Sequence, residues 1–382
     1  MDESKLRIQS YVGREGLSSF FGDWEDLMTR IRKQCFYHHP RWFRAFLGKT
    51  DEDDENIVFV CAYREATLVA VFPTTWSRRK VDGMLEVSLP FGEELYLADW
   101  AMADEEDAAA LYTLYREHLS EVIGEPWDLF KVQDVLEDGC LASAMVECGR
   151  FSQTVYPEKL CAEVPIANYE EAIKNLRKKF RGNLNNARSK LERAGNTQYS
   201  VFRAPDEIGL AFQEFVDLEM KGWKGSPDKP REKYPRPSAI GLKAKKLRFY
   251  ESAVRYFSEI DCAEISMLKL DDQTIGAQIC LLLNETSYLV KVAYDESAGR
   301  FSPGQLLIDH AYQRYAEEGK IKRYNLITDY AWFSGWNPEY RHYLVMRDFN
   351  STIKGAVACL RSKVGLRARK NKMLKTSAIA VS

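Results

Sequence analysis

Several features that would fix a compartment or a chemistry are missing from this 382-residue chain. No apolar run approaches the roughly 18 residues that a membrane-spanning helix needs, so we expect no transmembrane segment. The start, MDESKLRIQ, is polar and acidic, unlike a secretory signal. The eight cysteines are scattered without a CxxC pair, which favours reduced thiols over a disulfide framework or a zinc site. These absences predict a cytoplasmic protein.

Short signatures of several enzyme classes are missing as well. The chain has no Walker loop, no dinucleotide fingerprint, no HExxH and no GxSxG. Cys35, His38 and His39 lie close together, but a metal site needs more ligands at a suitable spacing. The aromatic residues around them predict a packed cluster instead. We therefore expect no metal cofactor.

The composition is that of an ordinary globular protein, 45% hydrophobic and 29% charged, and the length suits two domains. Charge is unevenly distributed. Residues 1–160 carry 17 Lys and Arg against 30 Asp and Glu, a net of −13, whereas residues 161–382 have a net of +11. The basic half is the natural place for an anionic cofactor or substrate, although attraction between the halves explains the asymmetry equally well.

The chain from Lys354 onward carries eight Lys and Arg and no acidic residue. Such a segment is compatible with contact to membrane lipid or nucleic acid, but a simple charged terminus is the more common case. We expect no DNA partner. The oligomeric state cannot be derived from the sequence.

A strand–turn–strand pattern occurs twice, at residues 56–76 and 262–283. Each copy is followed by a strand and a helix. In the first half these are Trp127–Val132 and Gly139–Cys148, and in the second half they are Tyr288–Tyr294 and the helix after Ser302. The pattern predicts a duplicated α/β module, with one domain at 1–160 and another at 161–382.

The second half gives the clearer order of elements. Asn168 and Glu171 form a capping-box-like start to a helix that keeps one apolar stripe and a basic opposite face as far as Ala194. Two more helices are predicted at about 206–223 and 242–257, and a proline-rich loop separates them. Strands are predicted at 262–270, 274–283, 288–294, 323–327 and near 343–349.

Ser302-Pro303-Gly304 is the most informative short segment. It joins the predicted strand that ends at Tyr294 to an amphipathic helix. The Ser302 hydroxyl suits the N-cap, Pro303 suits the first helical position, and Gly304 leaves the first turn without a side chain. With Arg300 nearby, this helix start suits a bound anion. The alternative is a well-capped helix with no ligand.

The predicted elements of the second half follow the order of the GNAT acyltransferase core. That order is three antiparallel strands, a helix, a strand, a short helix and a strand. The chain resembles the GNAT-like acetyltransferases of the CelD/BcsL type, which are associated with cellulose and exopolysaccharide synthesis. The segments that carry the resemblance are WEDLMTRIRKQCFYHHPRWFRAFL, KKFRGNLNNARSKLERAG, EMKGWKG and KVAYDESAGRFSPGQLLIDHA. That family is related to the Fem peptidyltransferases, which have two GNAT-like domains. The resemblance implies an α/β (α+β) fold of tandem GNAT-like acyl-CoA N-acyltransferase domains, with mixed, mostly antiparallel sheets flanked by helices.

The resemblance also implies where ligands bind. The pantetheine arm of acetyl-CoA or another acyl-CoA would pair with the backbone of Lys291, Val292 and Ala293. The pyrophosphate would lie against Ser302, Gly304 and Gln305, with Arg300 beside them, although only part of the usual GNAT phosphate loop is present. The residues expected at the catalytic centre are Tyr294, Asp295, Asp329 and Tyr330. The residues expected to contact substrate are Arg181, Trp223, Lys224 and Trp336.

Three functions are compatible with these residues. The first is transfer of an acyl group from acyl-CoA to an amine or hydroxyl of a carbohydrate precursor or amino compound. A Fem-like transfer from aminoacyl-tRNA is the second, for which the basic helix between Lys174 and Arg193 would suit tRNA. The third is a non-catalytic binding subunit of a polysaccharide-synthesis assembly. The sequence identifies neither the acceptor nor the length of the acyl chain.

Overall fold

The structure is a computed structural model that describes residues 6–49, 56–90, 98–226 and 237–365. It contains two compact units. Unit 1 is built from residues up to 31, from 56 to 159 and from 342 to 365, and unit 2 from 32 to 49 and from 160 to 341, each without the undescribed positions. A single division at residue 160 would put segment 32–49 in the first domain and segment 342–365 in the second. In the structure, segment 32–49 belongs to unit 2 and segment 342–365 to unit 1.

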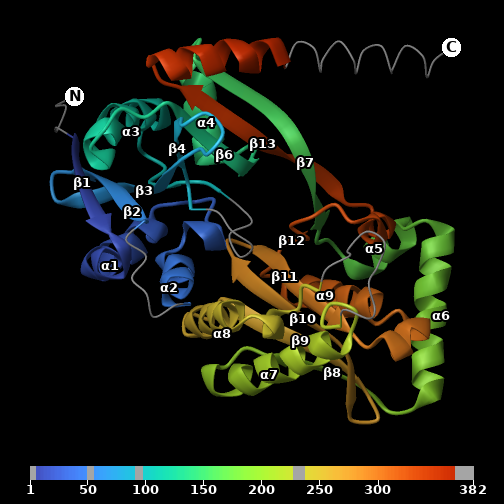
Figure 1. Ribbon diagram of the computed structural model, residues 1–382. Helices are drawn as coiled ribbons and strands as arrows, with labels where there is room; N and C mark the ends of the chain where they lie inside the picture. Colours follow the sequence, from blue (N-terminus) through green and yellow to red (C-terminus); the bar gives the residue numbers. More distant parts are fainter. Residues whose placement is uncertain (1–5, 50–55, 91–97, 227–236, 366–382) are drawn as a thin grey trace, which may run out of the picture. The chain divides into compact units, whose positions relative to one another are not determined.

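The sheet of unit 1 has the strand order β1-β2-β3-β4-β6-β13, and β5 pairs separately with β3. All neighbours in this order are antiparallel except β4 and β6, which are parallel. Its strands are β1 (Leu6–Val12), β2 (Val58–Arg64), β3 (Thr67–Arg78), β4 (Leu85–Ser88), β5 (Ala101–Met102), β6 (Leu129–Leu136) and, from His342 onward, β13 (Glu339–Phe349). Its helices are α1 (Gly13–Thr29), α3 (Ala108–Ile123), α4 (Cys140–Cys148) and a last helix at 353–365 (Figure 1).

Unit 2 repeats this plan with the strand order β8-β9-β10-β11-β12-β7. Only the β11–β12 pair is parallel. Its strands are, from Leu160 onward, β7 (Gln153–Pro165), and then β8 (Thr197–Phe202), β9 (Ala263–Leu270), β10 (Gln273–Leu283), β11 (Thr286–Tyr294) and β12 (Arg323–Asn325). Its helices are α2 (Pro40–Gly48), α5 (Tyr169–Asn175), α6 (Lys178–Ala194), α7 (Pro205–Lys221), α8 (Ala244–Ser258) and α9 (Pro303–Glu318). Short 3-10 helices are η1 (Phe36–His38), η2 (Ile240–Leu242), η3 (Glu296–Phe301) and η4 (Ala331–Trp336).

The predicted fold class is confirmed: both units are mixed α/β, with mostly antiparallel strands flanked by helices. The repeat is clearest at the parallel pairs, where β4, α3 and β6 of unit 1 correspond to β11, α9 and β12 of unit 2. The predicted internal correspondence, with Trp127–Val132 and Gly139–Cys148 as the counterparts of β11 and α9, was wrong. It missed β4 and α3, because a four-residue strand gives too little hydrophobic alternation to detect.

The last strand of each half is exchanged. β7 ends the first half of the chain, yet it pairs with β12 in unit 2 through Arg323↔Pro165 and Asn325↔Glu163. β13 ends the second half and pairs with β6 in unit 1 along Tyr343 to Phe349. Each unit therefore needs a strand from the other half to complete its sheet, which explains the discontinuous units.

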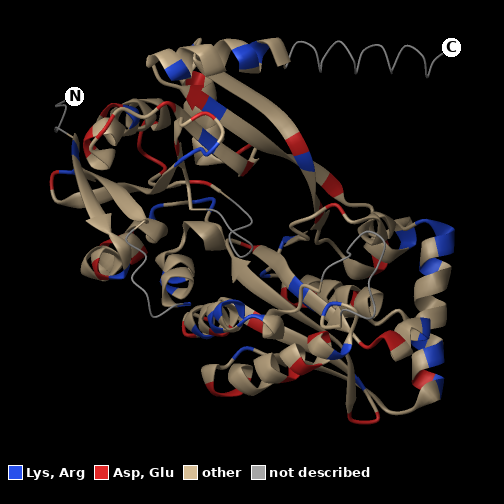
Figure 2. Ribbon diagram, viewed as in Figure 1, with Lys and Arg blue, Asp and Glu red and all other residues tan. Residues whose placement is uncertain are grey.

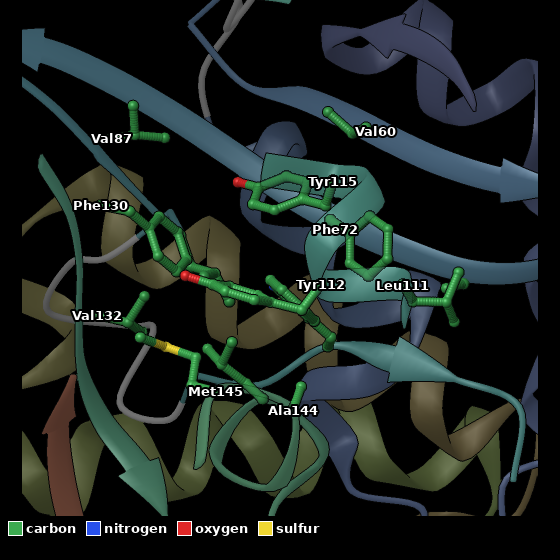
Figure 3. Packing of buried hydrophobic residues seen from close by; sticks show 14 of the residues in the cluster. Val60, Phe72, Val87, Leu111, Tyr112, Tyr115, Phe130, Val132, Ala144 and Met145 are labelled. Carbon is green, nitrogen blue, oxygen red and sulfur yellow. The ribbon is translucent and has the colours of Figure 1, made fainter. Parts of the chain in front are cut away.

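The core of unit 1 is formed mainly by aromatic and branched side chains between the sheet and helices α3 and α4 (Figure 3). Phe72, Tyr112, Tyr115 and Phe130 meet there with ring centroids between 5.0 and 6.3 Å apart. Edge-on and tilted contacts of this kind stabilise a core beyond the area that they bury. The opposite face of the sheet packs on α1, where Phe20 and Trp24 lie against Phe59.

The two faces of the unit 2 sheet bury different helices. Ser287 of β11 contacts Tyr315 of α9, whereas the next residue, Tyr288, contacts Phe36 on the other face. α8 lies on that second face, since the Lys291 ammonium lies over the ring of Tyr250, and α7 packs beside α8. This alternation is the two-residue period of a strand.

One helix prediction was wrong. The expected continuous helix from Asn168 to Ala194 is two helices, α5 and α6, because Leu176 and Arg177 have extended backbone with ψ of 150° and 132°. The predicted start is confirmed, since the Asn168 side chain accepts from the Glu171 N–H at 3.1 Å. The apolar stripe runs through both helices, so periodicity alone did not reveal the break.

The residues around Cys35, His38 and His39 form the packed cluster that was expected, with Phe36, Tyr37 and Trp42 buried. In the described part of the chain, no group of three His, Cys, Asp or Glu side chains is arranged to hold a metal ion. None of the eight cysteines forms a disulfide. Among the described residues, no helix has both the length and the apolar character needed to cross a bilayer.

His39 makes stability depend on pH. Burial, with a smaller contribution from the Arg41 charge, lowers the pKa of His39 to about 3. The unfolded chain binds a proton below about pH 6.5, whereas the folded protein does not until the pH is near 3, so stability is lost as the pH falls through this window. At pH 5 the loss is about 2 kcal/mol relative to neutral pH.

Melts of the wild type and His39→Asn at pH 7 and pH 5 check this prediction. Asn keeps an acceptor for the Arg41 N–H, which His39 Nδ1 caps at 3.3 Å, but it does not titrate. The variant should lose about 2 kcal/mol less than the wild type between these pH values. An equal loss in both proteins would assign the pH dependence to other groups.

Candidate active site

The fourth and fifth strands of unit 2 separate partway along their length. β11 pairs with β12 only from Thr286 to Tyr288, and Tyr288↔Asn325 is the last pair. Immediately afterwards the β10–β11 register shifts, so that Val290 is an extra residue in β11. A bulge bends the strand that carries it and is typical of strands beside active sites. Backbone groups of β11 from Leu289 to Tyr294 therefore have no β12 partner.

A lysine from the loop after α7 reaches this separation. The Lys224 ammonium donates to the Val292 carbonyl at 2.7 Å and to the buried Glu219 carboxylate at 3.2 Å. Glu219 in turn accepts from the Ile240 N–H at 2.7 Å, which fixes its position. The backbone N–H of Trp223 donates to Glu296 at 3.3 Å. Val292, Lys224 and Trp223, three of the expected site residues, are thus brought together.

The start of α9 lies next along the chain. Ser302 occupies the N-cap position, but its φ of 52° is left-handed and its side chain makes no cap hydrogen bond, so the expected hydroxyl cap is wrong. Its carbonyl instead accepts from the N–H groups of Gln305 and Leu306. The Gly304 N–H has no backbone acceptor among the described residues, and the first turn contains no acid. This helix start therefore remains able to bind an anion.

Arg300 adds positive charge near this helix start. Its guanidinium stacks on Phe301 at 4.6 Å, is exposed, and has no carboxylate partner in the described part of the chain. Gly276 of β10 lets the first turn of α9 pack closely on the sheet, because a Cβ there would lie 3.1 Å from the side chain of Pro303. An exposed cation and a tightly held helix start favour binding of a phosphate group.

Gln305 and Trp336 form one wall of this region. The Gln305 amide donates to the Trp332 carbonyl at 2.8 Å and accepts from the Trp336 indole N–H at 2.7 Å. Trp336 is buried between Phe180 and Tyr312. The Trp332 ring lies beside Gly304, 3.8 Å from where a Cβ would be. The Gln305 and Trp336 side chains thus fix the η4 segment against α9.

The four residues expected at the catalytic centre differ in their surroundings. Tyr294 ends β11 and is partly buried. Asp295 accepts from the backbone N–H and the hydroxyl of Ser297, at 2.8 and 2.7 Å, and so caps η3. Asp329 and Tyr330 are exposed and follow β12, which ends at Asn325 rather than at the predicted residue 327.

Arg181 lies near the N-terminal end of α6 and donates to the Lys174 carbonyl at 2.8 Å, which ties α6 to α5. Further along the same helix, Arg188 forms an ion pair with Asp309 of α9 and also donates to the Tyr169 hydroxyl. Figure 2 shows the Lys and Arg residues that follow the length of α6. Part of this basic face is therefore used for packing within unit 2.

A buried polar cluster at the point of separation was not predicted. Glu163 of β7 is 4% exposed and accepts from the Asn325 amide at 3.2 Å. Its second oxygen lies 3.4 Å from Arg341 and has no hydrogen-bond donor among the residues that the structure describes. Asn325 also accepts from the Ile327 N–H at 2.8 Å. Ile327 has a φ of 59°, a strained conformation for a branched residue. Glu163 and Asn325 thus hold the turn by which the chain leaves β11.

Tyr288 completes this cluster from β11. Its hydroxyl donates to the Cys35 thiol at 3.1 Å, and burial, followed by the effect of Cys35, raises the pKa of Tyr288 well above its ordinary value. No local sequence signal marks these residues, because Cys35, Glu163, Tyr288 and Asn325 come from four separate segments of the chain. The one available hint was Glu163 itself, a carboxylate within the buried run Cys161–Val164 at the end of β7.

The equivalent helix of unit 1 begins differently. The Asp107 carboxylate accepts from the Ala110 N–H at 2.9 Å and caps α3. A carboxylate already satisfies this helix start, whereas the N-cap residue of α9, Ser302, makes no side-chain cap hydrogen bond within the described part of the chain. The start of α3 is thus already occupied by a carboxylate, whereas the start of α9 keeps for an anion the Gly304 N–H, which has no backbone acceptor among the described residues.

Residues 178–333, from α6 to η4, match the family model described as the acetyltransferase (GNAT) domain. The chain contains a GNAT acetyltransferase domain. The matched segment includes the separation of β11 from β12 and the uncapped start of α9. This domain supports an acyltransferase enzyme of the GNAT type. No curated protein sequence matches the chain.

Solved structures similar over most of the chain include FemX, with a TM-score of 0.57 at 11% identity, covering 85% of this chain and 95% of that one. The structure of L-PGS from Bacillus licheniformis has a TM-score of 0.51 at 12% identity, covering 92% and 97%. A conserved protein from Bacteroides thetaiotaomicron has a TM-score of 0.53 at 11% identity, covering 87% and 97%. At these identities the similarity shows the fold alone, and it extends over both units rather than only over residues 178–333.

Proposed function

We propose that the protein moves an acyl group, acetyl in the simplest case, from acyl-CoA to an amine or hydroxyl of a carbohydrate precursor or amino compound in the cytoplasm. One observation carries this proposal: β11 leaves β12 directly before a helix start with no side-chain cap. The pantetheine arm would lie along Lys291, Val292 and Ala293. The pyrophosphate would lie at the Gly304 N–H, with Arg300 beside it.

The reaction needs orientation more than chemical activation, because a thioester is already reactive. The acceptor nitrogen or oxygen attacks the thioester carbonyl carbon, the new bond forms, and the bond from carbon to sulfur breaks. The acceptor proton passes to a base and the departing thiolate takes up a proton.

We assign these proton transfers to residues at the strand ends. Asp329, which is exposed and follows β12, is the proposed base, and Tyr294 the proposed acid. Asp295 and Tyr330 would orient them. Arg181, Trp223 and Lys224 would contact the acceptor, with Trp336 supporting the wall behind it.

A second candidate is a Fem-like transfer from aminoacyl-tRNA. The similarity to FemX in fold and the basic α6 favour it. Under this reading Lys178 and Arg181 would contact the tRNA backbone. The residue resemblance to CelD/BcsL-type proteins supports a role in exopolysaccharide synthesis instead, as an enzyme or as a binding subunit.

A thermal-shift titration with acetyl-CoA and longer acyl-CoAs tests the proposed donor. A ligand that binds only the folded state adds about 2.7 kcal/mol at a hundred times its Kd, so the melting temperature should rise with concentration. S-Acetylpantetheine is the control, and it should give a smaller shift because it keeps the acyl group and the pantetheine arm but lacks the pyrophosphate and the nucleotide. No shift with any acyl-CoA at millimolar concentration would contradict the proposal.

A further inference from the structure

The last helix of unit 1, residues 353–365, has two opposite apolar faces. Gly355 and Cys359 are buried against the unit, and Cys359 belongs to a small core with Met84, Leu129 and Phe349. A second stripe, spaced by four, three and four residues, faces solvent and is formed by Ile353, Val357, Leu360 and Val364. At 100° per residue this outer stripe lies opposite the buried face.

The outer stripe is unusually exposed for apolar side chains. Ile353 is 86% exposed, Val364 68% and Leu360 61%. Phe151, which is also exposed, lies near this helix, since the Lys363 ammonium is 3.1 Å from the centre of its ring. A contiguous exposed apolar surface of this kind marks a contact with a partner or a membrane.

Positive charge borders the stripe on both sides. Lys354 and Arg361 lie along one edge of the helix and Lys363 along the other, and Figure 2 shows blue segments on this helix. The sequence after residue 365 adds five Lys and Arg and no acid. An apolar stripe between rows of cations is typical of helices that lie in the surface of an anionic membrane.

A cationic groove of about 690 Å³ runs beside the Lys354 and Arg361 edge. Two acids and five cations line it, and the cations are Arg79, Lys131, Arg347, Lys354 and Arg361. Arg79 is paired with Asp82 and Glu86, but Lys131 and Arg361 have no hydrogen bond or ion pair with any described residue. Two unpaired cations next to an apolar floor suit the phosphate of an anionic amphiphile.

We infer that this face of unit 1 binds the surface of an anionic lipid bilayer, with the outer stripe among the acyl chains and the groove at a headgroup phosphate. A nucleic acid would use the cations but offers no apolar phase for the stripe. A second copy of the chain would cover the stripe but would bring the same positive charges together. An anionic bilayer offers both an apolar phase for the stripe and negative charge for the cations.

Flotation of the full-length protein with vesicles tests this inference. The protein should bind vesicles of equal parts phosphatidylcholine and phosphatidylglycerol, bind phosphatidylcholine alone much more weakly, and dissociate as salt is raised. Leu360→Glu should weaken binding to the anionic vesicles by at least about tenfold. Lys131→Ala and Arg361→Ala should each weaken it about fivefold.

Leu210→Glu is the matched control, because Leu210 is 79% exposed on α7 in unit 2 and should be irrelevant to lipid binding. All these side chains are exposed or at a groove, so melting temperatures should stay close to that of the wild type. Failure to bind anionic vesicles, or equal binding by Leu360→Glu and the wild type, would overturn the inference. So would a dimer that forms without lipid and is lost in Leu360→Glu.

Discussion

Gly304→Asp should abolish most of the affinity for acyl-CoA while leaving the protein folded. The new carboxylate would lie in the first turn of α9, where we place the pyrophosphate, and like charges at one site cost several kcal/mol. We therefore expect calorimetry to show affinity for acetyl-CoA at least about a hundredfold lower. An acid in a first helical turn complements the helix dipole, and a Cβ at Gly304 meets only Trp332 at an ordinary distance. The melting temperature should change little.

Gly209→Asp is the control for this variant. Gly209 lies near the start of α7, another helix with proline at its first position, and a Cβ there meets nothing within 4 Å. It adds the same charge to the same unit away from the proposed site, so affinity should be unchanged. A folded Gly304→Asp protein with wild-type affinity would rule out a phosphate site at this helix start. Loss of tRNA binding in Lys178→Ala and Arg181→Ala would then favour the aminoacyl-tRNA reading.

Glu264→Gln should destabilise unit 2 far more than the loss of an exposed carboxylate would. Glu264 of β9 is fully buried and accepts from Arg314 at 2.6 Å, from Arg203 at 3.0 Å and from the Tyr315 hydroxyl. Burial, and then the Glu264 charge, raises the pKa of Tyr315, which keeps that hydroxyl a neutral donor. Removing one partner from a buried ion pair costs about 3–5 kcal/mol, because the remaining charges stay buried.

Calorimetric melting of Glu264→Gln should show unit 2 unfolding about 10 °C lower. Glu318→Gln is a close control, because Glu318 pairs with the same two arginines at 3.1 and 3.0 Å but is partly exposed. Exposed pairs contribute about 1 kcal/mol or less, so its melting temperature should drop only slightly. Equal effects of the two substitutions would show that burial of Glu264 does not set the strength of this contact.

Sequence patterns predicted the second half well wherever local chemistry sets the boundary. The bounds of β9, β10 and β11 agree with prediction to within two residues, since Asp271-Asp272 and Asn284-Glu285 form tight turns with positive φ between them. α9 begins at Pro303 and ends before Gly319, as those residues predict.

The features that the sequence did not predict depend on distant parts of the chain. The exchange of β7 and β13 is set by which sheet edge each strand completes, and hydrophobic alternation does not distinguish one edge from another. For the same reason Glu163 had no assigned role, because its partner Asn325 lies on a strand of the other half. The hydroxyl cap at Ser302 was plausible by composition and failed because the backbone there is left-handed.

Contacts between the expected site residues also depend on distant parts of the chain. Lys224 and Val292 were each chosen by resemblance, and the structure joins them through a hydrogen bond that no spacing rule contains. Trp336 and Gln305 were chosen for ligand contact, yet their side chains bond to each other. The region proposed as the site stays a prediction, and the pairing of its side chains is a property of the folded unit that local patterns do not contain.

Native mass spectrometry of the full-length protein after incubation with acetyl-CoA is the sharpest test of the proposed donor site. We expect a complex whose added mass equals one acetyl-CoA per chain. That complex should be retained in Gly209→Asp and absent in Gly304→Asp. Absence of any complex with acetyl-CoA or longer acyl-CoAs in the wild type, or equal complexes in wild type and Gly304→Asp, would contradict binding at the start of α9.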